Sequence, residues 1–375
     1  MKCAVIGGGI NGIMSAWALA KRGHSVDLFE RGGLMDATSS ASTKLIHGGL
    51  RYLEQGEFRL VRESLRERVF WLNAAPHIVH PIRLTLPIYK SSRRQRWIAR
   101  CGLFLYDLLA GPARLGPTEW LSAEQAAKQC PELREEELLG AFAFYDAQMD
   151  DRALGLWAAQ GAAAAGVAIH TFSAVGSITT TGQVNLGLGM GSYDAVVNVA
   201  GPWAEDLLRK SGLQLRHSLD LVRGSHLLLN RVANNGYLVE VPWERRLCFI
   251  LPYYGQTLLG TTEVRQTLQD PIECSDKEQQ YLLRVYNHHM KEPALEQDVA
   301  SKFAGIRPLV RSHADQSRAT REYAIEREGR VVSVFGGKWT TARALGERVA
   351  AEAESIGLHQ AQRPDLELAG SVRRN

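Results

Sequence analysis

The glycine pattern near the N-terminus constrains the fold more than any other feature of the sequence. Gly7, Gly9 and Gly12 form Gly-x-Gly-x-x-Gly between an apolar run, CAVI, and a helical pattern over residues 11–22. Glu30 closes the next apolar run, HSVDLFE. This order predicts a βαβ unit whose glycines let the backbone approach a pyrophosphate and whose terminal carboxylate accepts from ribose hydroxyls. We therefore predict a dinucleotide site; the alternative is a glycine-rich turn in a purely structural βαβ unit.

Composition narrows the class of protein. The chain has 375 residues, 45% of them hydrophobic and 22% charged, which is ordinary for a globular protein of two domains. A net charge of +4 does not suggest nucleic-acid binding. The five cysteines are scattered and contain no Cys-x-x-Cys pair, so we expect neither a disulfide framework nor a metal site. We find no secretory signal and no apolar run long enough to span a membrane, and expect a cytoplasmic protein.

The remaining patterns suggest two interleaved domains. Apolar residues at three- and four-residue spacing predict an amphipathic helix over residues 58–72, and Asp150 or Asp151 can cap an Ala-rich helix that ends at Gly166. Strand-like pieces follow residue 217, then a charged helix over residues 277–290. The chain ends in a strand, a double glycine and a long helix, with a loose tail beyond Gln360. A short hairpin is expected just after Val175.

FAD and NAD share the glycine fingerprint, so the choice between them depends on a resemblance. Residues 37–68, ATSSASTKLIHGGLRYLEQGEFRLVRESLRER, closely resemble the signature of FAD-dependent glycerol-3-phosphate dehydrogenases of the respiratory type. Further matches are GLFLYDLLAG, MDDRAL, NVAGPWAEDL, VRGSHLLL, LLGTTEV, AGIRPLV, ATREYAI and SVFGGKWTTAR. The resemblance covers nearly the whole chain and implies non-covalent FAD.

The resemblance also implies a fold and a division of the chain. The expected fold class is α/β, with a Rossmann-like, glutathione-reductase-like FAD-binding domain and an interleaved β-sheet cap domain. We assign residues 1–76, 146–216 and 302–375 to the FAD-binding domain, and residues 77–145 and 217–301 to the cap. The resemblance also implies a helical C-terminal domain after the final helix, which we expect this chain to lack.

Residue by residue, the resemblance implies a set of FAD contacts. Small hydroxyls and backbone amides between Thr38 and Ser42 suit a diphosphate, although such a run in isolation is more often a plain loop. The N-terminus of the last helix can face the flavin edge that becomes anionic on reduction. The implied contacts are Gly7, Gly9, Asn11, Gly12, Glu30, Thr38, Ser39, Ser42, Lys44, Leu45, Val175, Ala200, Gly201, Gly337, Lys338 and Thr340.

The same resemblance also implies a set of residues that contact the substrate. Arg51 and Arg307 would clamp a dianionic phosphate, because a guanidinium fork matches its oxygens. Oxidation of an alcohol also needs a proton acceptor, for which a histidine is suited; the sequence does not decide between two of them. The full candidate set is His47, Arg51, Tyr52, His226, Thr262, Arg307 and Lys338.

Residues 90–111 form a basic amphipathic segment. Lys90, Arg93, Arg94, Arg96 and Arg100 accompany Trp97 and the apolar run after it. Such a segment can lie on an anionic bilayer, and members of the resembled family attach peripherally to the inner membrane face; a basic face packed on its own domain is the alternative.

Three functional hypotheses follow. The first is hydride transfer from glycerol 3-phosphate, or a related phosphorylated alcohol, to flavin N5. The second is an FAD-dependent oxidase or dehydrogenase of an amino acid or amine, in which one arginine binds a carboxylate. The third is a non-catalytic flavoprotein that keeps the fold. The electron acceptor, quinone or oxygen, and the oligomeric state are left open.

Overall fold

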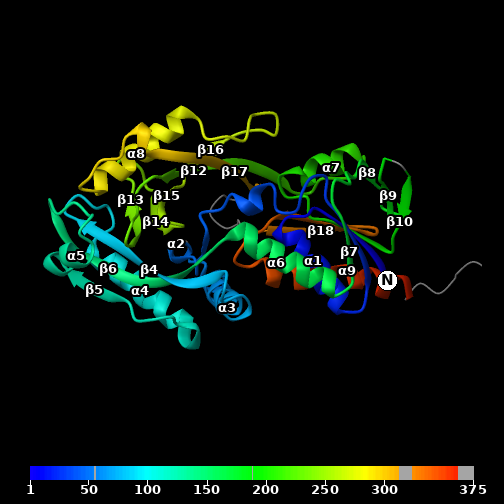
Figure 1. Cartoon of the computed structure of the whole chain (residues 1–375). Coiled ribbons are helices and arrows are strands. Elements are labelled where there is room, and N and C mark those ends of the chain that lie inside the picture. Colours follow the sequence, from blue (N-terminus) through cyan, green and yellow to red (C-terminus); the bar gives the residue numbers. More distant parts are fainter. Residues whose placement is uncertain (55, 188, 312–322, 362–375) are drawn as a thin grey trace, which may run out of the picture.

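The computed structural model describes residues 1–54, 56–187, 189–311 and 323–361, although the side chains of Arg51 and of residues 358–361 lie outside this description. Two large β-sheets organise these residues (Figure 1). The smaller sheet and its helices lie at the right of the view, and the larger one lies at the left. The tail predicted beyond Gln360 lies, from residue 362, outside the described residues.

The smaller sheet contains the predicted βαβ unit. Its strands run in the order β18 (Tyr323–Glu328), β19 (Val331–Gly336), β11 (Ala195–Asn198), β1 (Lys2–Ile6), β2 (Ser25–Phe29) and β7 (Val167–His170). All neighbours are parallel except β18, which is antiparallel to β19. Helix α1 (Ile10–Lys21) packs against α6 (Asp151–Ala164) and α9 (Ala342–Ala361) over this sheet. The central strands β1, β11 and β19 are almost fully buried and hydrophobic, as expected for a covered parallel sheet, whereas the edge strand β18 is half-buried.

The larger sheet has ten strands and is mostly antiparallel. The main order is β16 (Val264–Arg265), β12 (Ser218–Leu229), β15 (Gln256–Gly260), β14 (Leu247–Tyr253), β13 (Gly236–Glu240), β4 (Val79–Tyr89), β6 (Leu138–Met149) and β3 (Leu45–Ile46). Strand β17 (Val299–Arg311) pairs along β12, and β5 (Glu119–Ser122) pairs with β6.

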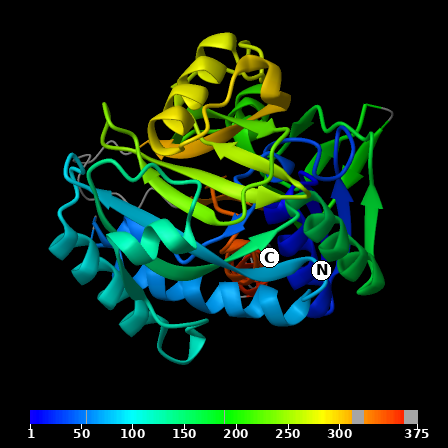
Figure 2. The ribbon, with the colours of Figure 1, turned by 60° about the vertical axis from the view of Figure 1, so that its left-hand side comes forward.

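Helices cover both faces of this sheet. Helix α8 (Asp276–His289) packs on one face with Tyr237 and Val239, while α4 (Arg96–Ala110) packs on the other with Leu238. This alternation is the period-two pattern of a strand buried on both sides. Figure 2 shows α8, in yellow, across the sheet from α4 and from α3 (Phe58–Ala74). The shorter helices are α2 (Leu50–Leu53), α5 (Ala123–Gln129) and α7 (Ala204–Lys210).

The predicted helices and the predicted fold class are confirmed. Asp150 caps α6 through a bond from the Ala153 amide to its carboxylate, and Ser275 and Glu278 form a capping box on α8. One local prediction is wrong: three short antiparallel strands, β8 (Ser177–Ile178), β9 (Gln183–Asn185) and β10 (Met190–Ser192), replace the expected hairpin. Gly182 and Gly187 both adopt positive φ, so the chain turns twice.

The division into domains stays a prediction. Strands β6 and β17 each lie wholly in the ten-stranded sheet, so the proposed boundaries at residues 146 and 302 fall inside continuous strands. Strand β3 also joins this sheet, although residues 1–76 were assigned to the other domain.

Candidate FAD and substrate site

The turn between β1 and α1 leaves backbone amides available to an anion. Gly7 has φ of +121°, and a Cβ there would lie 2.5 Å from the Val199 carbonyl oxygen. A Cβ on Gly12 would lie 1.8 Å from the Gly7 carbonyl oxygen, so neither position tolerates a side chain without movement. Gly9 is the N-cap of α1 and supplies no side-chain acceptor. The positive end of α1 therefore opens beside this turn.

Glu30 is held at the end of β2. The Gly8 amide donates to its Oε2 at 2.6 Å, and the Gly32 amide donates to its Oε1 at 2.8 Å. Each carboxylate oxygen has a further lone pair. Glu30 is therefore oriented next to the glycine turn and can still accept from ribose hydroxyls.

The predicted polar run contacts the larger sheet and helix α1, which packs on the smaller sheet. Thr38 Oγ1 donates to the Ile306 carbonyl at 2.7 Å, while Ser39 Oγ accepts from the Ile10 amide at 3.0 Å. These contacts place the run between the start of α1 and strand β17.

A buried carboxylate, Asp151, fixes the end of this run. Ser42 Oγ donates to its Oδ2 at 2.7 Å, and Lys44 Nζ donates to its Oδ1 at 2.6 Å. Sequence reasoning treated Asp151 only as a possible helix cap. Its place in MDDRAL, one of the segments that carry the family resemblance, could have indicated a role near the cofactor.

The last strand and helix bring a further group of candidates to the same place. Gly336 and Gly337 have φ of 82° and 101°, and Trp339 Nε1 donates to the Ser39 carbonyl at 2.8 Å. Asn11 Nδ2 donates to the Gly336 carbonyl at 3.4 Å, and its buried Oδ1 has no hydrogen-bond partner among the described residues. An orphaned acceptor beside open amides fits a bound cofactor with both polar donors and an anionic diphosphate.

The remaining predicted FAD contacts lie in several different elements of the fold. Ala200 and Gly201 follow Val199, whose carbonyl adjoins Gly7. Leu45 is buried in β3, and Thr340 is buried with its carbonyl accepting from Trp71 Nε1. Val175 is half-buried in an apolar cluster that includes Phe29 of β2.

Three of the predicted substrate residues gather beside the last helix. Lys338 Nζ lies 3.9 Å from the centre of the Tyr52 ring, and the Tyr52 and His47 ring centres are 6.4 Å apart. Arg51 belongs to α2, next to Tyr52, and its side chain lies outside the described part of the structure.

The other three gather on the ten-stranded sheet. Arg307 Nη2 donates to Thr261 Oγ1 at 2.7 Å and to the Thr262 carbonyl at 3.4 Å. Glu263 makes an ion pair with the same guanidinium at 3.4 Å. About a third of the Arg307 side chain is exposed, so an incoming anion can reach it.

His226, a predicted substrate residue, lies next to the predicted FAD contact Lys44. Its Nε2 lies 2.9 Å from Thr43 Oγ1, beside Lys44, and its ring stacks on Phe303 with centres 4.9 Å apart. Its Nδ1 is buried without a hydrogen-bond partner among the described residues. Burial, and then the charges of Arg307 and Lys44, hold the pKa of His226 well below its ordinary value, so the imidazole is neutral at neutral pH. Thr43 was missed, although it lies within the matched segment.

Residues 2–352 match the model of a family described as FAD dependent oxidoreductase. The chain belongs to this family. It is 39% identical over 368 residues to the glycerol-3-phosphate dehydrogenase of Pseudomonas aeruginosa, covering 92% of this chain and 70% of that one. It is 38% identical to the D-erythritol 1-phosphate dehydrogenase of Brucella abortus, with 92% of this chain and 72% of that one covered.

Solved structures show the same fold for this FAD-dependent oxidoreductase. The glycerol-3-phosphate dehydrogenase of Bacillus halodurans, complexed with FAD, superposes with a TM-score of 0.77 at 25% identity, covering 96% of this chain and 65% of that one. Glycine oxidase from Geobacillus kaustophilus, at 22% identity and a TM-score of 0.71, covers 95% of this chain and 94% of its own, and shows the fold alone.

The predicted resemblance and cofactor are thereby confirmed: FAD is the cofactor of this oxidoreductase. The N-terminus of α1, Glu30 and the unpartnered Asn11 oxygen fit it. The individual FAD and substrate contacts stay predictions. Among the described residues, no group of His, Cys, Asp and Glu is arranged to hold a metal ion.

Proposed function

We propose that this FAD-dependent oxidoreductase oxidises glycerol 3-phosphate or a related phosphorylated alcohol such as erythritol 1-phosphate. One observation carries the proposal: two residues with cationic side chains, distant in sequence, each stand next to a residue that is bonded to the same short segment, Thr38–Ser42. Arg307 follows Ile306, which is bonded to Thr38, and Lys338 precedes Trp339, which is bonded to Ser39. Two cationic residues next to the contacts of this predicted FAD-binding run suit a dianionic phosphate better than a substrate with a single carboxylate. The dehydrogenases named above act on substrates of this kind.

The roles of the side chains follow from their surroundings. Arg307 offers a planar fork for two phosphate oxygens, and Lys338 adds a compact charge. His226 is favoured over His47 as proton acceptor, because a neutral, buried imidazole can take the hydroxyl proton at Nδ1. When bound, FAD supplies the hydride acceptor at N5.

Anaerobic bleaching of the flavin absorbance tests the substrate. We expect glycerol 3-phosphate or erythritol 1-phosphate to bleach the holoenzyme, and glycine and proline to leave it yellow. Arg307→Ala should keep FAD and lower kcat/KM by a factor that corresponds to about 2–5 kcal/mol of transition-state stabilisation, because the substrate anion loses one of its cationic partners. Bleaching by the amino acids alone would instead support the oxidase hypothesis. Reoxidation of the bleached flavin by oxygen or by a soluble quinone, followed in the same cuvette, shows which of the two is the electron acceptor.

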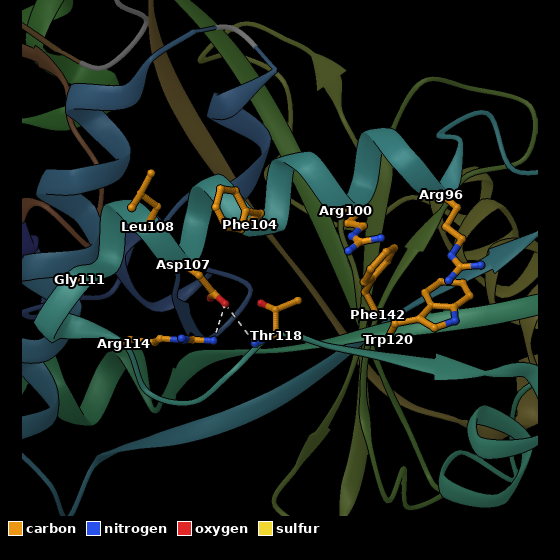
Figure 3. A pocket seen from close by; sticks show the side chains of 10 residues that line it. All are labelled: Arg96, Arg100, Phe104, Asp107, Leu108, Gly111, Arg114, Thr118, Trp120 and Phe142. Atoms are coloured by element: carbon orange, nitrogen blue, oxygen red, sulfur yellow. Dashed lines mark hydrogen bonds and ion pairs between the residues drawn. The ribbon is translucent and has the colours of Figure 1, made fainter.

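We also propose that α4 attaches the protein peripherally to an anionic membrane. Trp97, Phe104 and Leu108 are all more than half exposed and lie on one stripe of the helix, opposite its buried face. Arg96 and Arg100 lie beside this stripe and, with Phe104 and Leu108, line a 710 Å³ groove, where the Arg96 guanidinium lies 3.9 Å from the Trp120 ring and Arg114 is ion-paired with Asp107 (Figure 3). Apolar side chains beside arginines suit a bilayer with acidic headgroups. None of the described helices has the length and apolarity to cross a membrane.

Vesicle sedimentation tests this attachment. We expect the holoenzyme to bind phosphatidylcholine vesicles that contain phosphatidylglycerol, and to be released by salt. The double change Phe104→Ser and Leu108→Ser should abolish binding. Phe172→Ser, which removes an equally exposed ring after β7, is the control and should bind as the wild type does. Equal loss in both variants would contradict the assignment to α4.

A further inference from the structure

Glu278 is a buried carboxylate with an unusual number of donors. It lies in the first turn of α8 and is 5% exposed. Thr262 Oγ1 and Ser225 Oγ each donate to its Oε1 at 2.7 Å. Arg223 Nη2 at 2.8 Å and Ser275 Oγ at 2.7 Å donate to its Oε2. The carboxylate is therefore fully engaged on both oxygens.

Two of these donors, Ser225 and Thr262, belong to the segments that hold Arg307, the arginine predicted to bind the substrate anion. The Ser225 amide also donates to Thr262 Oγ1 at 2.9 Å, which ties β12 to the turn after β15. In that turn, Thr261 Oγ1 and the Thr262 carbonyl are acceptors for the Arg307 guanidinium. Glu278 therefore fixes Thr262, and Thr262 lies against Arg307.

The charge of the carboxylate strengthens this arrangement. Burial alone would raise the pKa of Glu278, but the hydrogen bonds from Thr262, Ser275 and Ser225 outweigh burial and lower the pKa to about 2. The group is ionised at any pH at which the enzyme is assayed. Hydrogen bonds to an ionised acceptor are shorter and stronger than neutral ones, so they hold the turn in one position.

We propose that Glu278 is a positioning residue that orients Arg307, through the Thr261–Thr262 turn, for the anionic end of the substrate. The inference rests on the proposed function, because Arg307 is assigned to the substrate phosphate there. Glu278 does not touch the substrate. Its contribution is to substrate affinity, whereas the proton acceptor His226, one residue beyond Ser225, has contacts of its own with Thr43 and with Phe303 of β17.

A purely structural role in capping α8 makes a different prediction. Ser275 and Glu278 form the capping box of this helix, so either change weakens the cap. Ser275→Ala weakens the cap and removes one donor to Oε2, but leaves the bonds from Thr262 and Ser225 to Oε1. Glu278→Gln keeps the side-chain volume, removes the charge, and places an amide donor among groups that are themselves donors. The two variants therefore form a matched pair.

The experiment measures KM and kcat with glycerol 3-phosphate, the inhibition constant of inorganic phosphate, and the flavin content of each holoenzyme. For Glu278→Gln we expect KM and the phosphate inhibition constant to rise together by roughly tenfold or more, with kcat within about threefold of wild type and flavin content unchanged. For Ser275→Ala we expect both constants to stay near the wild-type values.

Two outcomes overturn the proposal: wild-type KM in Glu278→Gln, or the same rise in both variants. If Glu278→Gln does not fold, Ser225→Ala, which removes one donor to Oε1, should give a smaller rise in KM; no rise would overturn the proposal as well. A wild-type enzyme that does not oxidise the phosphorylated alcohol overturns the proposed function and this inference together. Turnover with an unmoved KM overturns the inference alone.

Discussion

At the scale of single residues, a buried ion pair supports the turn that carries His47 and Tyr52. Arg68 and Asp146 are both almost completely buried, with Arg68 Nη1 2.8 Å from Asp146 Oδ1. Tyr106 Oη donates to the same carboxylate at 2.7 Å, and the Gly48 amide donates to it at 3.0 Å. Buried charges are tolerated only when they are paired, so each member depends on the others.

Removing the carboxylate should therefore be costly. We expect Asp146→Ala to lower the free energy of unfolding by about 3–5 kcal/mol, because Arg68 is left buried without its counter-charge. Urea denaturation followed by tryptophan fluorescence measures the loss. Glu119→Ala breaks a surface ion pair with Arg83 and should cost about 0–1 kcal/mol. Similar losses in the two variants would contradict the importance of burial.

His289 should make stability depend on pH. Burial holds the pKa of His289 at about 4, below its ordinary value of 6.5, despite the hydrogen bond from Nε2 to the Glu240 carbonyl. Between pH 6.5 and 4 the unfolded chain binds a proton that the folded one does not, so stability falls as the pH is lowered through this window. We expect His289→Gln to reduce that slope by up to about 1.4 kcal/mol per pH unit. The exposed His77→Gln is the control; an unchanged slope in His289→Gln would refute the prediction.

At the scale of elements, local sequence patterns predicted more of the molecule than of its site. The glycine spacing and the apolar periods were enough for β1, α1, β2 and α3, since these depend on neighbours along the chain. The contacts of Thr43 with His226 and of Thr262 with Glu278 join different elements of the fold, and no spacing rule relates them. For α4, both faces are apolar, so the sequence alone could not decide which one is buried.

The close packing of α1 on β1 gives a prediction for this element. A Cβ at Gly12 would press on the Gly7 carbonyl, so we expect Gly12→Ala to displace the turn and lose most of the bound FAD, with a stability cost of about 1–3 kcal/mol. The ratio of flavin to protein absorbance after gel filtration measures this loss. Gly102→Ala places a methyl group in open space on α4 and should retain the cofactor. Full flavin content in Gly12→Ala would contradict the packing argument.

At the scale of the whole molecule, the polar run Thr38–Ser42 connects the two halves of the structure. Thr38 is bonded to β17 of the larger sheet, while Ser39 is bonded to the first residue of α1 over the smaller one. Residues predicted to contact FAD thus belong to both halves, and the larger sheet contributes the predicted substrate residues Arg307 and His226. The site forms only when the two sheets are packed together.

FAD should therefore stabilise the molecule as one unit. At a free concentration 100 times Kd, bound FAD adds about 2.7 kcal/mol to the free energy of unfolding. We expect a single urea transition, monitored by fluorescence and by far-ultraviolet circular dichroism, that shifts to higher urea when FAD is restored to the stripped protein. Two transitions, of which only one responds to FAD, would show that the sheets unfold independently.

The strand order of the smaller sheet has a consequence for biosynthesis. β1 leaves the ribosome first, yet one of its two neighbours, β11, begins only at Ala195, and β19 completes that side from Val331 onwards. At typical rates of translation, β1 would wait on the order of ten seconds or more for β11. The nascent chain therefore exposes one apolar, unpaired edge of β1 until β11 has emerged, and this side of the nucleotide-binding sheet is complete only once β19 has been synthesised.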